Sequence, residues 1–141
     1  MYSILRKERL NDNQIFFLEI EAPWIADAGL PGQFVIVVPH EKAERIPLTI
    51  SDIDYQNHSV SIVFQVVGET TRQLSEMNVG DGVYAIVGPL GRPSELIAEH
   101  KANPQAFQRL LFVAGGVGTA PVYPQVKWAH ENGIPVDVIV R

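Results

Sequence analysis

Hydrophobic and polar residues alternate in short blocks along residues 1–90, and turn-forming residues separate the blocks. The alternation is clearest over residues 59–67, where Val60, Ile62 and Phe64 would share one face of a strand. Further blocks of this kind occupy residues 3–9, 14–21, 33–38, 45–51 and 83–87. Six short strands with regular turns between them predict a small all-β, antiparallel Greek-key barrel that is closed or nearly closed.

A helical pattern interrupts the strands once and then replaces them. Thr70 and Thr71 open a stretch that predicts a short helix over residues 70–77, because a hydroxyl residue can cap a first helical turn. After Pro93, residues 94–103 are polar with helical spacing. A proline at position 104 ends this second helix, since the residue before a proline avoids the helical region.

The last part of the chain predicts a strand–helix–strand unit. Residues 110–114 (LLFVA) form a continuous apolar run, which is typical of a strand buried on both faces. A helix from about residue 120 ends at Asn132-Gly133, and residues 134–140 form a second apolar strand. We expect this unit to be the beginning of an α/β, Rossmann-like domain.

The pattern divides the chain into three parts. Residues 1–92 form the barrel, residues 93–108 form a linker with a helix, and residues 109–141 form the first β-α-β unit of an incomplete nucleotide-binding domain. Two parallel strands and one helix cannot bury both faces of a parallel sheet. We therefore expect the chain to be an N-terminal fragment of a longer protein, or a partner chain to complete the sheet.

Composition excludes several classes of function. The chain has 141 residues, of which 46% are hydrophobic and 19% charged, with a net charge of −5 and no basic cluster, so a nucleic-acid partner is not expected. No apolar run approaches the roughly 20 residues of a membrane span, and we see no signal peptide, so we expect a cytoplasmic protein. The absence of cysteine excludes disulfides, thiol nucleophiles and cysteine-ligated metals within this sequence.

A glycine cluster follows the first apolar strand of the last unit. Residues 115–121 read GGVGTAP and lead directly into the predicted helix. Glycine lets a ligand approach the main chain, and the N–H groups at a helix start favour a pyrophosphate. Gly115, Gly116 and Gly118 are therefore candidates for nucleotide binding. The alternative is a turn that only packs a strand against a helix.

Two further motifs in the barrel can bind a phosphate or a polar ring. Gly68, Thr70 and Thr71 form a second helix start with backbone and hydroxyl donors, although they can also be a simple helix cap. Arg45 can pair with a phosphate, and the hydroxyl of Thr49 can hydrogen-bond a flat polar ring. The alternative for these two residues is an exposed cation and a threonine that favours a strand.

The order of these motifs resembles the ferredoxin–NADP reductase superfamily, in which a flavin-binding barrel precedes a nicotinamide-binding domain. The resemblance covers nearly the whole chain and is carried by residues 31–35 (PGQFV), 45–50 (RIPLTI), 67–71 (VGETT), 88–91 (GPLG) and 115–121. A narrower branch is especially similar. It contains the electron-transfer subunit of dihydroorotate dehydrogenase and the small subunit of NADH-dependent ferredoxin:NADP oxidoreductase, also called sulfide dehydrogenase.

The resemblance implies FAD in the barrel and NAD(P)H at the glycine cluster. Thr49 would be the catalytic position, hydrogen-bonded near the flavin N5, while Pro47 and Leu48 would line the isoalloxazine. Counted back from Thr49, the family's arginine and stacking tyrosine fall on Ile46 and Leu48, so Arg45 lies one residue upstream. No metal ligand is implied in this sequence. The implied cofactor-binding residues are Arg45, Pro47, Leu48, Thr49, Gly68, Thr70, Thr71, Gly115, Gly116, Gly118 and Thr119.

The function that this resemblance implies is that of a subunit of an FAD-dependent NAD(P)H oxidoreductase, of which this chain would be an inactive or partial fragment. Electrons would pass from NAD(P)H through FAD to an iron–sulfur centre. A [2Fe–2S] cluster is expected only beyond Arg141, and the expected partners are a larger oxidoreductase subunit and a ferredoxin-like acceptor. One alternative is a non-catalytic docking barrel with a degenerate cofactor cleft. Another is an oxygenase-type reductase subunit.

Overall fold

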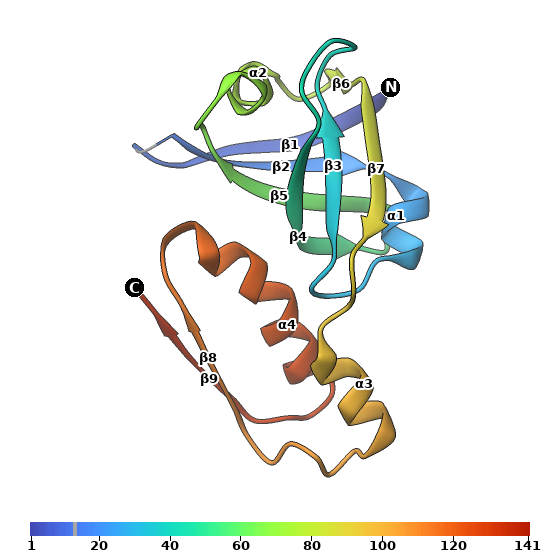
Figure 1. The fold of residues 1–141 in the computed structure, drawn as a ribbon, viewed down its shortest axis with the longest axis vertical. Helices are drawn as coiled ribbons and strands as arrows, with labels where there is room; N and C mark the ends of the chain where they lie inside the picture. Colours follow the sequence, from blue (N-terminus) through green and yellow to red (C-terminus); the bar gives the residue numbers. More distant parts are fainter. Residues whose placement is uncertain (13) are drawn as a thin grey trace.

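The computed structural model describes residues 1–12 and 14–141, and its elements form two groups (Figure 1). The first group holds antiparallel strands with the helices α1 (Pro23–Ala28) and α2 (Glu69–Glu76). The second holds a small parallel sheet with a helix beside it, and α3 (Glu95–Ala102) lies between the two groups along the chain. Within the described residues, no helix has the length and apolar character needed to cross a membrane.

Seven strands of the described residues form the first group, and together they make a barrel. They are β1 (Tyr2–Asn11), β2 (Ile15–Glu21), β3 (Phe34–Val38), β4 (Ile46–Asp54), β5 (Ser59–Gln65), β6 (Gly82–Val83) and β7 (Ala85–Leu90). Their spatial order is β6-β1-β2-β5-β4-β3-β7, and every neighbouring pair is antiparallel. The Greek-key connection places β2 beside β5.

The barrel nearly closes because the two ends of this strand order are neighbours in the sequence. Only Tyr84 separates β6 from β7 along the chain, so the edge strands of the sheet must lie close together. The Tyr84 N–H donates to the carbonyl of Pro39, which follows β3. The nearly closed antiparallel barrel predicted from the sequence is therefore confirmed, and seven short strands take the place of the six expected.

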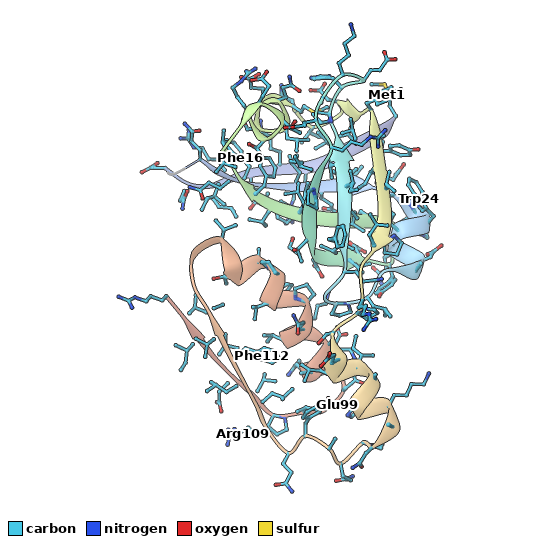
Figure 2. The ribbon with its side chains drawn as sticks, in the orientation of Figure 1. Met1, Phe16, Trp24, Glu99, Arg109 and Phe112 are labelled. Carbon is cyan, nitrogen blue, oxygen red and sulfur yellow. The ribbon has the colours of Figure 1, made fainter. Side chains whose placement is uncertain are left out.

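The barrel interior is filled by the inward residues of alternating strands. On β5, Val60, Ile62 and Phe64 are at most 2% exposed, as the alternation predicts. Leu18 of β2 lies opposite Ile62 in the antiparallel register, and both are fully buried. Figure 2 shows Phe16 near the end of the barrel that carries α2, where its ring lies 6.1 Å from that of Phe64.

The second group is a parallel β-α-β unit. It consists of β8 (Leu110–Ala114), the 3-10 turn η1 (Gly116–Gly118), α4 (Thr119–Glu131) and β9 (Val136–Val140). Its strands pair in parallel from Leu110 opposite Val136 to Ala114 opposite Val140. In Figure 1, α4 lies between this sheet and the barrel. The strand–helix–strand unit predicted at the end of the sequence therefore forms.

Some local expectations were wrong. Helix α1 was not predicted, because it has no side-chain cap and begins with a proline directly after β2. The strand expected over residues 83–87 was placed too short at its end, because β7 continues to Leu90. Gly88 is needed there for close packing, since a Cβ atom would lie 2.9 Å from Cγ1 of Val35.

The inward face of β5 provides a test of this core. We expect Ile62→Ala to lower the free energy of unfolding by about 2–5 kcal/mol, because the removed atoms leave a cavity in a fully buried layer. Val79→Ala is the control: Val79 is 60% exposed, so its loss should change the free energy by no more than about 0.5 kcal/mol. Urea unfolding followed by circular dichroism measures both, and equal effects would contradict this core.

Candidate functional site

An open cleft of about 390 Å³ lies where the barrel meets the second group. Its walls come from β4, β5, the start of α2, the turn η1 and the start of α4. The residues that line it include Pro47, Leu48, Thr49, Thr71, Val117 and Pro121. Three motifs that are far apart in the sequence therefore meet at one cleft.

Strand β4 supplies the segment predicted to lie against a flavin. Pro47, Leu48 and Thr49 all line the cleft, and Thr49 is half-buried opposite Phe34 of β3. Ile46 and Leu48 also pack against the barrel core, which holds the strand in place from behind. The cleft thus has an aliphatic wall with one hydroxyl, and that combination suits a flat ring with polar edges.

Arg45 lies outside this cleft. Strand β4 begins at Ile46, so Arg45 precedes it, and the arginine side chain is exposed. The neighbouring carbonyl of Glu44 accepts a hydrogen bond of 3.1 Å from the hydroxyl of Thr70, at the start of α2. Arg45 is therefore adjacent in the chain to a residue that contacts α2, and it is not among the residues that line the cleft.

The start of α2 is a tight turn built by Thr71. Its hydroxyl accepts hydrogen bonds from the N–H groups of Val67 and Gly68, at 2.9 and 3.0 Å, and donates to the carbonyl of Gly68. Thr70 and Thr71 are both buried. Because the Thr71 hydroxyl is used within the turn, its role is to shape the helix start. The first N–H groups of the helix have no partner within it and can receive an anion.

The glycine turn lies on the opposite wall of the cleft. Gly116 has φ +56°, a left-handed conformation that favours glycine, and η1 leads directly into α4 at Thr119. The turn is held to the end of β9, since the N–H of Gly116 donates to the carbonyl of Arg141 at 3.1 Å. Two residues that follow Gly116, Val117 and Pro121, line the cleft.

The glycines fall into two groups: those whose packing or backbone conformation requires glycine, and open glycines, where a side chain would fit. In Gly29, Gly32, Gly82, Gly88 and Gly91, a Cβ atom would lie within 3 Å of other atoms of the chain, and Gly80, Gly116 and Gly133 have positive φ. Gly68 and Gly118 have neither constraint: both have ordinary φ, and a Cβ atom there would meet nothing within 4 Å. Gly115 is nearly as open, at 3.9 Å from the Arg141 carbonyl oxygen.

These open glycines are the ones at the two helix starts. Packing and backbone conformation do not require glycine at positions 68 and 118, so the chain's own fold does not explain the choice. Close approach of a ligand to the main chain does explain it, because a side chain would occupy the space that the ligand needs. This observation supports two anion-binding sites, one at the start of α2 and one at the start of α4.

The cleft continues past Val63 into two further cavities. An apolar cavity of about 350 Å³ is lined by Gly116, Val117, Thr119 and Val63 among others. A more polar cavity of about 360 Å³ includes Val63 and Ser51. Val63, on the outward face of β5, lines all three spaces, so they form one groove along the barrel wall. The alternation of β5 could have indicated Val63, but nothing in the sequence showed what it faces.

Few polar contacts hold α4 against the barrel. Lys127 Nζ lies 2.9 Å from Oδ1 of Asp52 in β4, and this is the salt bridge that joins the two groups within the described residues. The hydrogen bond to Asp52 is the main reason that the pKa of Lys127 is raised above its ordinary value of 10.5. Ser94, before α3, donates to the side chain of Gln125 at 3.0 Å. Neither contact could be predicted from the sequence.

The described residues contain no cluster of three or more His, Cys, Asp and Glu side chains that could hold a metal ion. The cleft of about 390 Å³ therefore offers backbone N–H groups, a few hydroxyls and apolar walls, and the polar cavity adds carboxylates and the guanidinium of Arg6. These groups can bind and orient a flat, phosphate-bearing molecule, but among the described residues they include no nucleophile hydrogen-bonded to a base.

Comparison with known proteins places this groove in context. The chain is 55% identical over 140 residues to an uncharacterized protein of Clostridium beijerinckii. It is 36% identical over 137 residues to a homologue of the electron-transfer subunit of dihydroorotate dehydrogenase B (NAD(+)) from Thermotoga maritima. These matches cover 99% and 97% of the chain. No protein-family model matches.

Solved structures agree with the sequence comparison. One match is the structure of NADH-dependent reduced ferredoxin-NADP oxidoreductase, which was studied for flavin-based electron bifurcation. It superposes on this chain with a TM-score of 0.85 at 34% identity, and the match covers 99% of this chain. The chain is thus similar to proteins that are named as electron-transfer subunits or their homologues. Ferredoxin-NADP+ reductase from Plasmodium falciparum shares the fold, with a TM-score of 0.76 at 18% identity. The predicted resemblance to the ferredoxin–NADP reductase superfamily is confirmed.

The chain spans about half the length of the proteins it matches. It covers 47% of the Clostridium protein, 45% of the Thermotoga protein, and 48% and 57% of the two solved chains. Those of the related proteins that carry a functional name are oxidoreductases, or homologues of oxidoreductase subunits. The shared portion in this chain contains the barrel, the cleft and the glycine turn.

The Lys127–Asp52 pair predicts a pH-dependent contribution to stability. We expect Lys127→Met to lower the free energy of unfolding by at most about 1 kcal/mol at neutral pH, because the pair is partly exposed. Because folding raises the pKa of Lys127, its charged form stabilises the fold, and this contribution is fully present below pH 10.5. The contribution is lost as the pH rises through the folded-state pKa of Lys127. The difference between wild type and variant should therefore shrink above that pH.

Urea unfolding at pH 8 and pH 11 measures this difference. Lys42→Met is the matched control, because Lys42 is exposed and forms no salt bridge within the described residues. A Lys127→Met effect that is the same at both pH values, or equal to that of the control, would rule out a contribution from the pair.

Proposed function

We propose that this chain is the flavin-binding part of an FAD-dependent NAD(P)H oxidoreductase subunit that transfers electrons to a partner. The observation that carries the proposal is the groove, where the Thr49 strand and two helix starts with open glycines meet. Two phosphate-bearing molecules with flat rings fit such a groove, with the phosphates of one at each helix start. The relatives named as electron-transfer subunits support the same assignment.

The residues of the main cleft suit FAD. Pro47 and Leu48 would contact the isoalloxazine, and the Thr49 hydroxyl would donate a hydrogen bond near N5, which makes Thr49 the proposed catalytic position. The pyrophosphate would bind the first N–H groups of α2 beside Gly68, in the turn shaped by Thr70 and Thr71. Arg45 would contribute a positive charge from just outside the cleft. Bound there, FAD supplies the ability to accept a hydride and release electrons singly.

The glycine turn suits the phosphates of a nicotinamide nucleotide. Gly115, Gly116, Gly118 and Thr119 surround the start of α4, whose N–H groups and dipole favour an anion. The turn shares a cleft with the proposed flavin-binding strand, since Val117 and Pro121 face Thr49 across it. A nucleotide held by this turn would therefore have its nicotinamide end directed toward the flavin.

The partners follow from the relatives. The dihydroorotate dehydrogenase B relatives are named as electron-transfer subunits, and phthalate dioxygenase reductase, which shares the fold with a TM-score of 0.70, is described as transferring electrons from pyridine nucleotides to [2Fe-2S]. We infer that this protein passes electrons to an iron–sulfur centre of a larger subunit or a ferredoxin-like acceptor. A cytoplasmic location remains a prediction.

The absorbance spectrum of the protein after incubation with excess FAD tests the proposal. We expect near-stoichiometric flavin that is released by acid and identified as FAD by chromatography. Thr49→Val should weaken FAD binding by about three- to tenfold, because it removes one hydrogen bond, whereas Thr49→Ser should retain it. Failure of the wild type to bind flavin would favour the alternative, a docking barrel with a degenerate cleft.

The two open glycines predict that substitutions at the two helix starts affect different ligands. Gly68→Ala should weaken FAD binding about tenfold or more, because backbone hydrogen bonds to a charged group are worth about 1.5–3 kcal/mol. Gly118→Ala should leave FAD binding unchanged and weaken NADH binding. Neither variant should destabilise the fold, since the added methyl group meets no atom within 4 Å.

Flavin fluorescence titration and calorimetric titration with NADH measure the two affinities, and thermal unfolding checks the fold. The two variants are controls for each other, because each adds one methyl group at a helix start. If Gly68→Ala and Gly118→Ala had the same effect on FAD binding, the assignment of separate phosphate sites would be wrong.

A further inference from the structure

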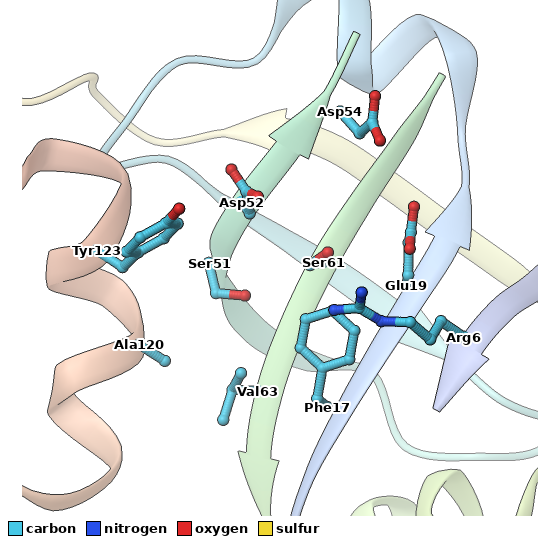
Figure 3. Close-up of a pocket in the computed structure, with 10 residues that line it drawn as sticks. All are labelled: Arg6, Phe17, Glu19, Ser51, Asp52, Asp54, Ser61, Val63, Ala120 and Tyr123. Atoms are coloured by element: carbon cyan, nitrogen blue, oxygen red, sulfur yellow. The ribbon is translucent and has the colours of Figure 1, made fainter. Parts of the chain in front are cut away.

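The polar cavity at one end of the groove is not explained by the proposed flavin site. Figure 3 shows its lining, with Ser51 and Asp52 on β4, Ser61 on β5, Glu19 on β2, Arg6 on β1 and Tyr123 on α4. The cavity holds about 360 Å³ between the outward face of the barrel and the second turn of α4. This is near the lower limit for a small-molecule site.

Ser51 is the feature that points to a ligand. Its side chain is 5% exposed, it lines the cavity, and its hydroxyl has no hydrogen-bond partner within the described residues. A buried hydroxyl without a partner is unfavourable, so such groups in folded proteins usually have a partner in water or in a ligand. The fold therefore keeps an unpaired polar group in the wall of a space that a polar molecule can fill.

Several carboxylates lie around Ser51, and some of their oxygens already accept hydrogen bonds from other residues of the fold. Oδ1 of Asp52 accepts from Lys127, and Oε2 of Glu19 accepts from the hydroxyl of Ser59 at 2.5 Å. Both oxygens of Asp54 accept hydrogen bonds from the turn that follows it. Within the described residues, Oδ2 of Asp52 and Oε1 of Glu19 remain as acceptors that line the cavity.

The charges select the class of ligand. Three carboxylates face the cavity against one guanidinium, that of Arg6, so an anion such as phosphate is disfavoured. The carboxylates do not converge into a group that could hold a metal ion within the described residues. An apolar ligand would leave the Ser51 hydroxyl unpaired. A neutral molecule with several hydroxyl groups remains, because it can donate to carboxylate oxygens and exchange hydrogen bonds with Ser51.

We propose that this cavity binds the hydroxyl groups of a ribose, the one that belongs to the nicotinamide nucleotide. The inference rests on the proposed function, since it needs the nucleotide phosphate at the start of α4. Ala120 and Tyr123, on the first and second turns of that helix, line both this cavity and the apolar cavity beside the glycine turn. A ribose joined to a phosphate at the turn reaches Ser51 along this path.

A titration of the FAD-loaded chain with nicotinamide mononucleotide tests the proposal. Binding is followed through the amide NMR signals of the ¹⁵N-labelled protein. We expect the signals of Ser51, Ser61 and Tyr123 to shift, and Ser51→Ala to weaken binding by about three- to tenfold. Ser75→Ala is the matched control, because the Ser75 hydroxyl donates to the carbonyl of Arg72 on α2, away from the cavity. The Ser75→Ala variant should bind nicotinamide mononucleotide as tightly as the wild type does.

Thermal unfolding separates a ligand role from a structural one. Ser51→Ala should not lower the stability of the ligand-free protein, because the hydroxyl has no partner there. A loss of stability, no binding of nicotinamide mononucleotide, or equal binding by wild type and Ser51→Ala would each overturn the ribose assignment. The flavin assignment is judged separately by FAD uptake, so its success or failure is distinguishable from these outcomes.

Discussion

The alternation of side chains along β4 and β5 is the constraint on which the rest of this structure depends. On β5, Val60, Ile62 and Phe64 fill the barrel, so Ser61 and Val63 must point outward and become the floor of the groove. A shift of one residue in the register would exchange the two faces and put serine in the core. The stability of the barrel and the shape of the groove are therefore fixed by the same pattern.

The groove also depends on where the two helices begin. Both α2 and α4 start next to glycine, and both starts meet the outward face of β4 and β5. The turn before α2 is held by the Thr71 hydroxyl, and the turn before α4 is held by the end of β9. Each turn is thus fixed by the chain itself, so its backbone donors are already oriented before a ligand arrives. Such preorganisation reduces the entropy lost on binding.

The sequence predicted the elements whose signals are local. Alternation identified the strands, and the apolar run with its glycines identified the β-α-β unit, whose glycine turn is one of the proposed phosphate sites. It did not predict α1, because Ala22 at its start offers no capping side chain and the local pattern reads as a continuation of β2. The Asp52–Lys127 pair joins residues 75 positions apart, and Ser51 matters only because of a cavity between β4 and α4. No local pattern encodes either feature.

The width of the groove depends on few contacts. Lys127 binds the barrel eight residues after Thr119, where α4 begins, and this separation corresponds to about 12 Å along the helix. A tilt of about 10° around the Lys127 contact would move the glycine turn by roughly 2 Å at that rise per residue. Reacting rings must approach to about 3–3.5 Å, so such a tilt separates a productive arrangement from an unproductive one. A surface ion pair that contributes little to stability can thus matter more for the distance between the two proposed cofactors than for the fold.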